Sequence, residues 1–136
     1  MRATLLFVVV GLLAACSVER TPLVATDISI SRPIPGMQMT AAYFTLTNNT
    51  TQTIKITRAT SPDFESVEMH ETILEDGMTR MYALGDLTIL PGTTVNFEPG
   101  GKHLMLIRPI TDVDSVTLEF YAGKAVVLTV AVPYRE

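Results

Sequence analysis

Two histidines, each close in sequence to a methionine, are the residues of this chain best suited to chemistry. The 136 residues contain two His, seven Met and one Cys. His103 and Met105 are two residues apart, so in a β-strand their side chains point to the same face, with backbones roughly 6–7 Å apart. An imidazole nitrogen and a thioether sulfur at that spacing can both reach one metal ion. The sequence therefore predicts half of a metal site at this position.

The other histidine is placed by a predicted hairpin around an Asp-Gly pair, residues 76–77. An Asp-Gly pair between two strand-like stretches is a strong signal for a two-residue turn. With that turn, His70 pairs with Ala83 and Thr72 pairs with Met81. Cross-strand partners share a face, as do residues two apart, so His70 and Met81 become diagonal neighbours on one face. A three-residue turn would change this parity.

The two pairs together form a set of four uncharged donors. Soft, neutral ligands favour Cu(I) over Cu(II). They discriminate against Ca²⁺ and Mg²⁺, which prefer oxygen, and zinc normally recruits Cys or a carboxylate. A site without thiolate should also pass copper to an acceptor that has one. The sequence thus indicates a candidate Cu(I) site of His70, Met81, His103 and Met105.

The remaining methionines have more ordinary interpretations. A buried Met is usually a core side chain, and Met69 and Met78 fall on the opposite face of the predicted hairpin from His70. Met37 and Met39 form a Met-x-Met pair. We interpret them as core or surface side chains, with an auxiliary copper contact as the alternative.

Two glutamates flank the histidine of the hairpin. Glu68 precedes His70 by two residues, and Glu71 follows it directly. Glu71 could orient the imidazole from a second shell. Neighbouring glutamates on an exposed strand are common, however, so we interpret both as solvated side chains.

The rest of the chain is typical of a β protein. After the first 16 residues no sustained 3.6-residue apolar period occurs, and Gly, Pro and Asn-Asn turns recur at short intervals. Short strands with such turns predict one domain built as a sandwich or barrel. The expected strands are residues 23–30, 40–47, 53–58, 64–73, 78–84, 87–90, 94–97, 102–107, 116–121 and 125–132.

The N-terminus is typical of a targeting segment. One Arg is followed by an apolar run and two small residues, a stretch too short to span a membrane as a mature helix. Its ending, LAAC at residues 13–16, resembles the bacterial lipobox. That resemblance implies lipidation of Cys16, which would become the first mature residue. An ordinary signal peptide cut elsewhere is the alternative.

This leader divides the chain into three parts. We expect a lipoprotein signal peptide at residues 1–15, a lipidated tether at 16–21 and a folded domain at 22–136. The residue after the Cys is Ser17 rather than Asp, which by resemblance permits sorting to the outer membrane. The expected location is the periplasmic side of a bacterial membrane, outer rather than inner, held by the lipid.

The spacing of the four donors resembles the pattern of a known family. His70 and Met81 are separated by ten residues, Met81 and His103 by 21, and His103 and Met105 by one. This is similar to the pattern of the periplasmic copper chaperones called the PCuAC family. The likeness covers about residues 21–132. The flanking stretches that resemble the family are residues 32–49, 69–71, 77–78, 80–81, 99–101 and 103–106.

The resemblance implies a fold, a cargo and partners. The domain would be a single all-β, cupredoxin-like or immunoglobulin-like β-sandwich. It would bind one Cu(I) through His70, Met81, His103 and Met105, without catalysis. The copper acceptor would be a cytochrome c oxidase subunit with its binuclear copper centre, or another copper chaperone.

Other functions stay open on the sequence. An electron-transfer copper protein would need a His₂Cys site with a weak axial Met, and the only Cys is in the leader. A metal-free binding or structural lipoprotein is the general alternative for a small β-sandwich. The net charge of −4, without a basic run, argues against a nucleic-acid partner. An enzyme is not expected, because no Ser elbow or Gly-rich phosphate loop is present.

Overall fold

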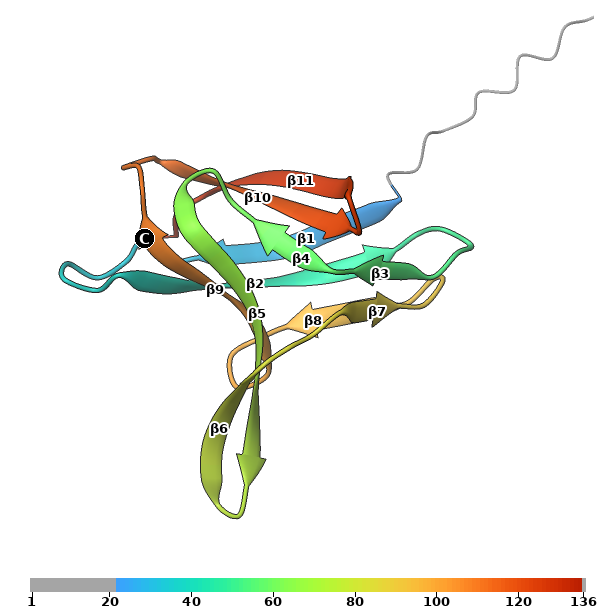
Figure 1. Ribbon diagram of the computed structural model, residues 1–136, viewed down its shortest axis with the longest axis horizontal. Helices are drawn as coiled ribbons and strands as arrows, with labels where there is room; N and C mark the ends of the chain where they lie inside the picture. The colour runs from blue at the N-terminus through green and yellow to red at the C-terminus, as the bar shows by residue number, and fades with distance from the viewer. Residues whose placement is uncertain (1–21, 136) are drawn as a thin grey trace, which may run out of the picture.

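The computed structural model describes residues 22–135, which form an all-β domain (Figure 1). The predicted all-β class is confirmed, whereas the predicted signal peptide, Cys16 and the tether lie outside the described residues. Within the part that the structure describes, no helix is long and apolar enough to cross a membrane. In chain order the strands are β1 (Leu23–Ile30), β2 (Met39–Asn48), β3 (Ile54–Ile56), β4 (Arg58–Thr60), β5 (Phe64–Glu75), β6 (Met78–Ala83), β7 (Leu87–Ile89), β8 (Thr94–Phe97), β9 (Lys102–Pro109), β10 (Ser115–Ala122) and β11 (Ala125–Pro133).

The largest sheet carries the candidate site. Its strands lie in the order β1-β2-β9-β5-β6, and β8 pairs with the second half of β2. A three-stranded sheet, β11-β10-β4, forms the other layer, and β3 and β7 make a small two-stranded sheet. The hairpin of β5 and β6 extends beyond the rest of the molecule (Figure 1). Strands β5 and β9, which hold the two histidines, are therefore direct neighbours.

The hydrophobic core lies between the two larger sheets. Phe44 of β2 meets the edge of Phe120 of β10, with ring centroids 5.5 Å apart. Along β9, Leu104 and Leu106 are fully buried in this core. Because side chains alternate along a strand, His103 and Met105, on either side of Leu104, face the outer side of the largest sheet. The predicted single-domain β-sandwich is confirmed, and the candidate donors of β9 lie on its outer face.

One predicted strand, residues 53–58, is two strands in the structure. β3 pairs with β7 and β4 pairs with β10, so the chain passes from one sheet to another at Thr57. The backbone amide of Thr57 donates to the carbonyl of Tyr121 at 2.8 Å. Ile56 and Ala59 are both buried, and a spacing of three breaks the alternation of a single strand. The prediction of one strand was wrong because periodicity does not reveal the pairing partner.

A buried amide at the end of β2 holds the adjoining turns. Asn48 is fully buried; its amide nitrogen donates to the carbonyls of Gln52 and Ile89 at 2.8 and 3.0 Å. Its Oδ1 accepts from the Thr50 amide and hydroxyl at 3.0 and 2.7 Å. We expect Asn48→Ala to lower the free energy of unfolding by about 1–3 kcal/mol, because it leaves buried polar groups without hydrogen-bond partners.

Urea denaturation measures this loss. Asn49→Ala, at the exposed neighbouring position, is the matched control and should change stability by less than about 0.5 kcal/mol. Equal stabilities for the two variants would show that the Asn48 hydrogen bonds do not hold the turns.

Candidate metal site

The β5–β6 hairpin has the register that the sequence predicts. His70 is opposite Ala83, and Met81 is opposite Thr72. The turn residues 76–77 have φ values of 51° and 74°. Positive φ at both positions is what a type I′ turn requires, which explains the Asp-Gly pair. The two-residue turn is confirmed, and its parity brings His70 and Met81 to one face of the hairpin.

His70 contacts both a sulfur and a carboxylate. Its Nδ1 lies 3.1 Å from Sδ of Met81, and its Nε2 lies 2.9 Å from Oε2 of Glu68. An ionised carboxylate only accepts hydrogen bonds, so Nε2 carries the proton, and in the neutral ring Nδ1 turns its lone pair toward the sulfur. Bonds of about 2.0 Å to nitrogen and 2.3 Å to sulfur separate two donors on a tetrahedral ion by roughly 3.5 Å. The observed separation is close to that value.

His103 lies directly across the sheet from His70. The two residues are paired between β9 and β5, and their ring centroids are 5.8 Å apart. His103 is only 5% exposed, and its Nδ1 lies 3.1 Å from the carbonyl oxygen of Gly101. A carbonyl oxygen accepts, so Nδ1 carries the proton and the neutral ring keeps its lone pair on Nε2. The backbone therefore selects the tautomer of His103, as Glu68 selects that of His70.

Met105 shares this face of the sheet. It is two residues from His103 on β9, and it pairs with Glu68 of β5 and Ala41 of β2. Met105 is half-buried, whereas Met81 is 50% exposed. The four predicted donors thus come from three adjacent strands, β6, β5 and β9, and lie on the outer face of the largest sheet.

Glu68, which the sequence interpretation left as a solvated side chain, is a contact of His70. The signal was present, because Glu68 and His70 are two residues apart in one strand and must share a face. Glu71 lies on the opposite face, where its Oε1 accepts from Nζ of Lys102 at 2.6 Å. The alternative that Glu71 orients His70 is therefore wrong, and Glu68 occupies that place.

The other methionines divide between the two faces. Met69 is buried in the core, as predicted. Met78 is exposed and pairs with Glu75, on the face of the hairpin away from His70, also as predicted. Met39 is the first residue of β2 and is exposed.

The nature of the donors favours a soft metal ion. Between residues 22 and 135 there is no group of three or more His, Cys, Asp or Glu that could hold a metal. Protein sites for zinc are built from those side chains, and sites for Ca²⁺ and Mg²⁺ from oxygen ligands. Two imidazoles with two thioethers instead suit a soft monovalent ion such as Cu(I).

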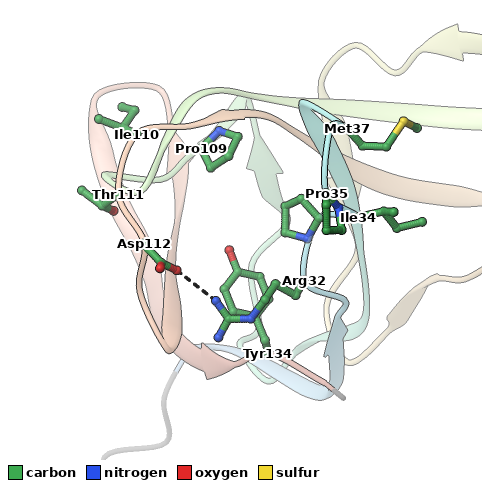
Figure 2. Close-up of a pocket in the computed structure, with 11 residues that line it drawn as sticks. Arg32, Ile34, Pro35, Met37, Pro109, Ile110, Thr111, Asp112 and Tyr134 are labelled. Atoms are coloured by element: carbon green, nitrogen blue, oxygen red, sulfur yellow. Dashed lines mark hydrogen bonds and ion pairs between the residues drawn. The ribbon is translucent and has the colours of Figure 1, made fainter.

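A pocket of about 390 Å³ is lined by none of the four donors (Figure 2). It lies between the β1–β2 loop and the β9–β10 loop. Nη1 of Arg32 is 3.1 Å from Oδ1 of Asp112, and the guanidinium lies over the ring of Tyr134 at 4.6 Å. Burial raises the pKa of Tyr134.

A smaller pocket of about 230 Å³ lies beside Glu68 and His70.

Comparison with solved structures defines the class of fold. A copper-bound PCuAC domain from PmoF2 superposes with a TM-score of 0.66 at 17% identity, over 84% of this chain and 92% of that domain. The solution structure of apo-DR1885 from Deinococcus radiodurans gives a TM-score of 0.62 at 26% identity, over 100% of this chain and 94% of that one. The protein therefore has the fold of a PCuAC domain, which confirms the resemblance.

Sequence comparison gives the family. A family model described as "Putative lipoprotein LpqE-like" matches residues 23–134, and the chain belongs to this family.

Two curated relatives are similar over part of their length. A putative lipoprotein of Leifsonia xyli subsp. xyli is 34% identical over 107 residues, or 74% of this chain and 63% of that protein. An uncharacterised protein of Rickettsia prowazekii is 30% identical over 76 residues, or 55% of this chain and 42% of that protein. The chain thus spans less than two thirds of the length of either relative.

Proposed function

We propose that this protein is a copper chaperone that binds one Cu(I) through His70, Met81, His103 and Met105 and passes it on by ligand exchange. The observation that carries the proposal is the contact between Nδ1 of His70 and Sδ of Met81 at 3.1 Å. Both atoms are electron-pair donors when the imidazole is neutral, and a soft cation between them would stabilise the pair.

The hydrogen bonds of the two histidines support this proposal. Glu68 and the Gly101 carbonyl each accept from one ring nitrogen. The nitrogens left to bind copper are Nδ1 of His70 and Nε2 of His103. Outer contacts of this kind fix the tautomer and orientation of metal-binding imidazoles. These hydrogen bonds would thus set the tautomer and the orientation of both imidazoles before the metal binds.

The same donor set supports a carrier rather than a permanent copper site. Four uncharged ligands hold Cu(I) without a thiolate, so an acceptor that offers thiolates can take the ion. We propose as acceptor a cytochrome c oxidase subunit with its binuclear copper centre, or another copper chaperone. The copper-bound PCuAC domain among the structural relatives supports copper as the cargo.

We also propose that the protein is anchored by lipid at Cys16, on the periplasmic side of a bacterial membrane and more specifically the outer membrane. The family description and the Leifsonia relative, both named as lipoproteins, support the anchor. A lipidated Cys with several acyl chains holds firmly, since each buried CH₂ adds about 0.8 kcal/mol. The anchor would restrict the carrier to acceptors at the membrane surface.

Competition titration with a Cu(I) chelator tests the proposal. We expect the protein to bind one equivalent of Cu(I) and the double variant His103→Ala/Met105→Ala to lose it. Met78→Leu is the control, since Met78 lies on the other face of the hairpin and should bind copper normally. Stoichiometric binding retained by the double variant would reject the ligand assignment.

Thermal unfolding separates a copper carrier from a metal-free binding protein. Free Cu(I) at 100 times its dissociation constant should add about 2.7 kcal/mol to the free energy of unfolding, which raises the midpoint. The melt is run in reductant with and without Cu(I). A midpoint that does not move would favour the metal-free alternative, and a strong visible band on adding Cu(II) would favour an electron-transfer site.

A further inference from the structure

We propose that Met39 is a fifth soft donor, next to Met105, through which Cu(I) leaves the site. This inference rests on the proposed function, because it requires Cu(I) to occupy the four-donor set first. Met39 belongs to β2, which contributes none of the four donors. The set would then extend across four adjacent strands instead of three.

The register puts Met39 on the donor face. Met39 pairs with Ile107 of β9, and Ala41 pairs with Met105. Met105 and Ile107 are two residues apart and share a face, so Met39 and Met105 are diagonal neighbours on it. His70 and Met81 have the same diagonal relation, and their donor atoms lie 3.1 Å apart. Two flexible methionine side chains that are diagonal neighbours on one face can both reach one ion.

Met39 is more exposed than either histidine of the set. His103 is 5% exposed, the side chain of His70 is 16% exposed, and Met39 is 45% exposed. An acceptor approaching this face therefore meets Met39 before it reaches the imidazoles. Met81 is exposed as well, but its sulfur already contacts His70.

The backbone at Met39 is held in place. Besides the pairing of Met39 with Ile107, the amide of Arg108 donates to the carbonyl of Gln38 at 2.6 Å. Met37 lies in the loop before β2 and lines the pocket of Figure 2, at the opposite end from Asp112. Met39 is thus fixed beside the donors, whereas Met37 belongs to a different surface.

The transfer step is a ligand exchange. A bond forms between copper and Sδ of Met39 while a bond to one of the original donors breaks. No proton or electron moves, and copper stays Cu(I). The ion then sits at an exposed thioether, from which the donor of an acceptor can displace it.

Nuclear magnetic resonance of the methionine ε-methyl groups tests this position. On addition of one equivalent of Cu(I) we expect the Met39 methyl signal to shift with those of Met81 and Met105, while Met69 and Met78 stay unchanged. Shifts of Met81 and Met105 without Met39 would overturn the inference and leave the proposed function intact. If none of the three signals moved, the proposed function itself would fail.

Release kinetics test the role in transfer. Met39→Leu keeps size and apolarity but removes the sulfur, and Met37→Leu is the matched control. We expect Met39→Leu to bind one Cu(I) but to release it to a chelator severalfold more slowly than the control. Release that is unchanged or faster in Met39→Leu would refute an exit role for Met39.

Discussion

Replacement of both histidines, His70→Ala with His103→Ala, is expected to abolish stoichiometric Cu(I) binding. Loss of an outer contact to a metal ligand typically costs 10–100-fold in affinity, so loss of two direct ligands should exceed about 100-fold, or about 2.7 kcal/mol. The two rings lie 5.8 Å apart on neighbouring strands, and the remaining thioethers are weak donors by themselves. Competition with a Cu(I) chelator measures the change.

The fold of this double variant needs its own check, because His103 is buried. His103→Gln is a milder substitution whose amide group still offers a donor for the Gly101 carbonyl. Circular dichroism should show a folded β protein for the Gln variant, with copper affinity still greatly reduced. If a folded variant that lacks both imidazoles bound Cu(I) as tightly as the unaltered protein, this result would contradict the proposed site.

Removal of the carboxylate beside His70 is expected to weaken copper binding by about 10–100-fold. In Glu68→Ala the Nε2 proton of His70 loses its acceptor, so the tautomer with its lone pair on Nδ1 loses the stabilisation of this hydrogen bond. The copper affinity of Glu68→Gln should lie between those of Glu68→Ala and the unaltered protein, because the Gln amide oxygen can still accept a hydrogen bond from Nε2. Chelator competition gives the affinities.

Imidazole nitrogen spectra distinguish this positioning role from a structural one. We expect His70 to be protonated at Nε2 in the unaltered protein and to become a mixture of tautomers in Glu68→Ala. Glu71→Gln is the control, since Glu71 pairs with Lys102 on the other face. The same tautomer and affinity in Glu68→Ala and the unaltered protein would show that Glu68 does not position His70.

Local patterns were enough to predict the parts of the site that depend on alternation and turn chemistry. The Asp-Gly pair at residues 76–77 required a two-residue turn, and that turn determined that His70 and Met81 share a face. The spacing of two between His103 and Met105 did the same on β9. Both predictions use contacts within one strand or one hairpin, where sequence separation is short.

Features that depend on pairing between distant strands could not be predicted in this way. Direct opposition of His70 and His103 follows from the pairing of β5 with β9, which no local pattern encodes. The division of residues 53–58 between two sheets has the same origin. Burial of His103 depends on its neighbours across the sheet, among them Tyr43 of β2.

The position of Met39 beside the candidate donors also could not be predicted from the sequence. Its sequence context, a Met-x-Met pair in front of a strand, gave no reason to prefer a copper contact over a surface side chain. Only the pairing of β2 with β9 puts it beside Met105. A residue can thus gain a possible chemical role from strand order alone.

X-ray absorption spectroscopy of the Cu(I)-loaded protein tests the central claim most directly, because it reports the elements bound to the metal. The proposed site predicts two nitrogen and two sulfur neighbours, with one sulfur lost in Met105→Leu. A first shell of nitrogen and oxygen only, or a sulfur contribution unchanged in both Met81→Leu and Met105→Leu, would contradict it.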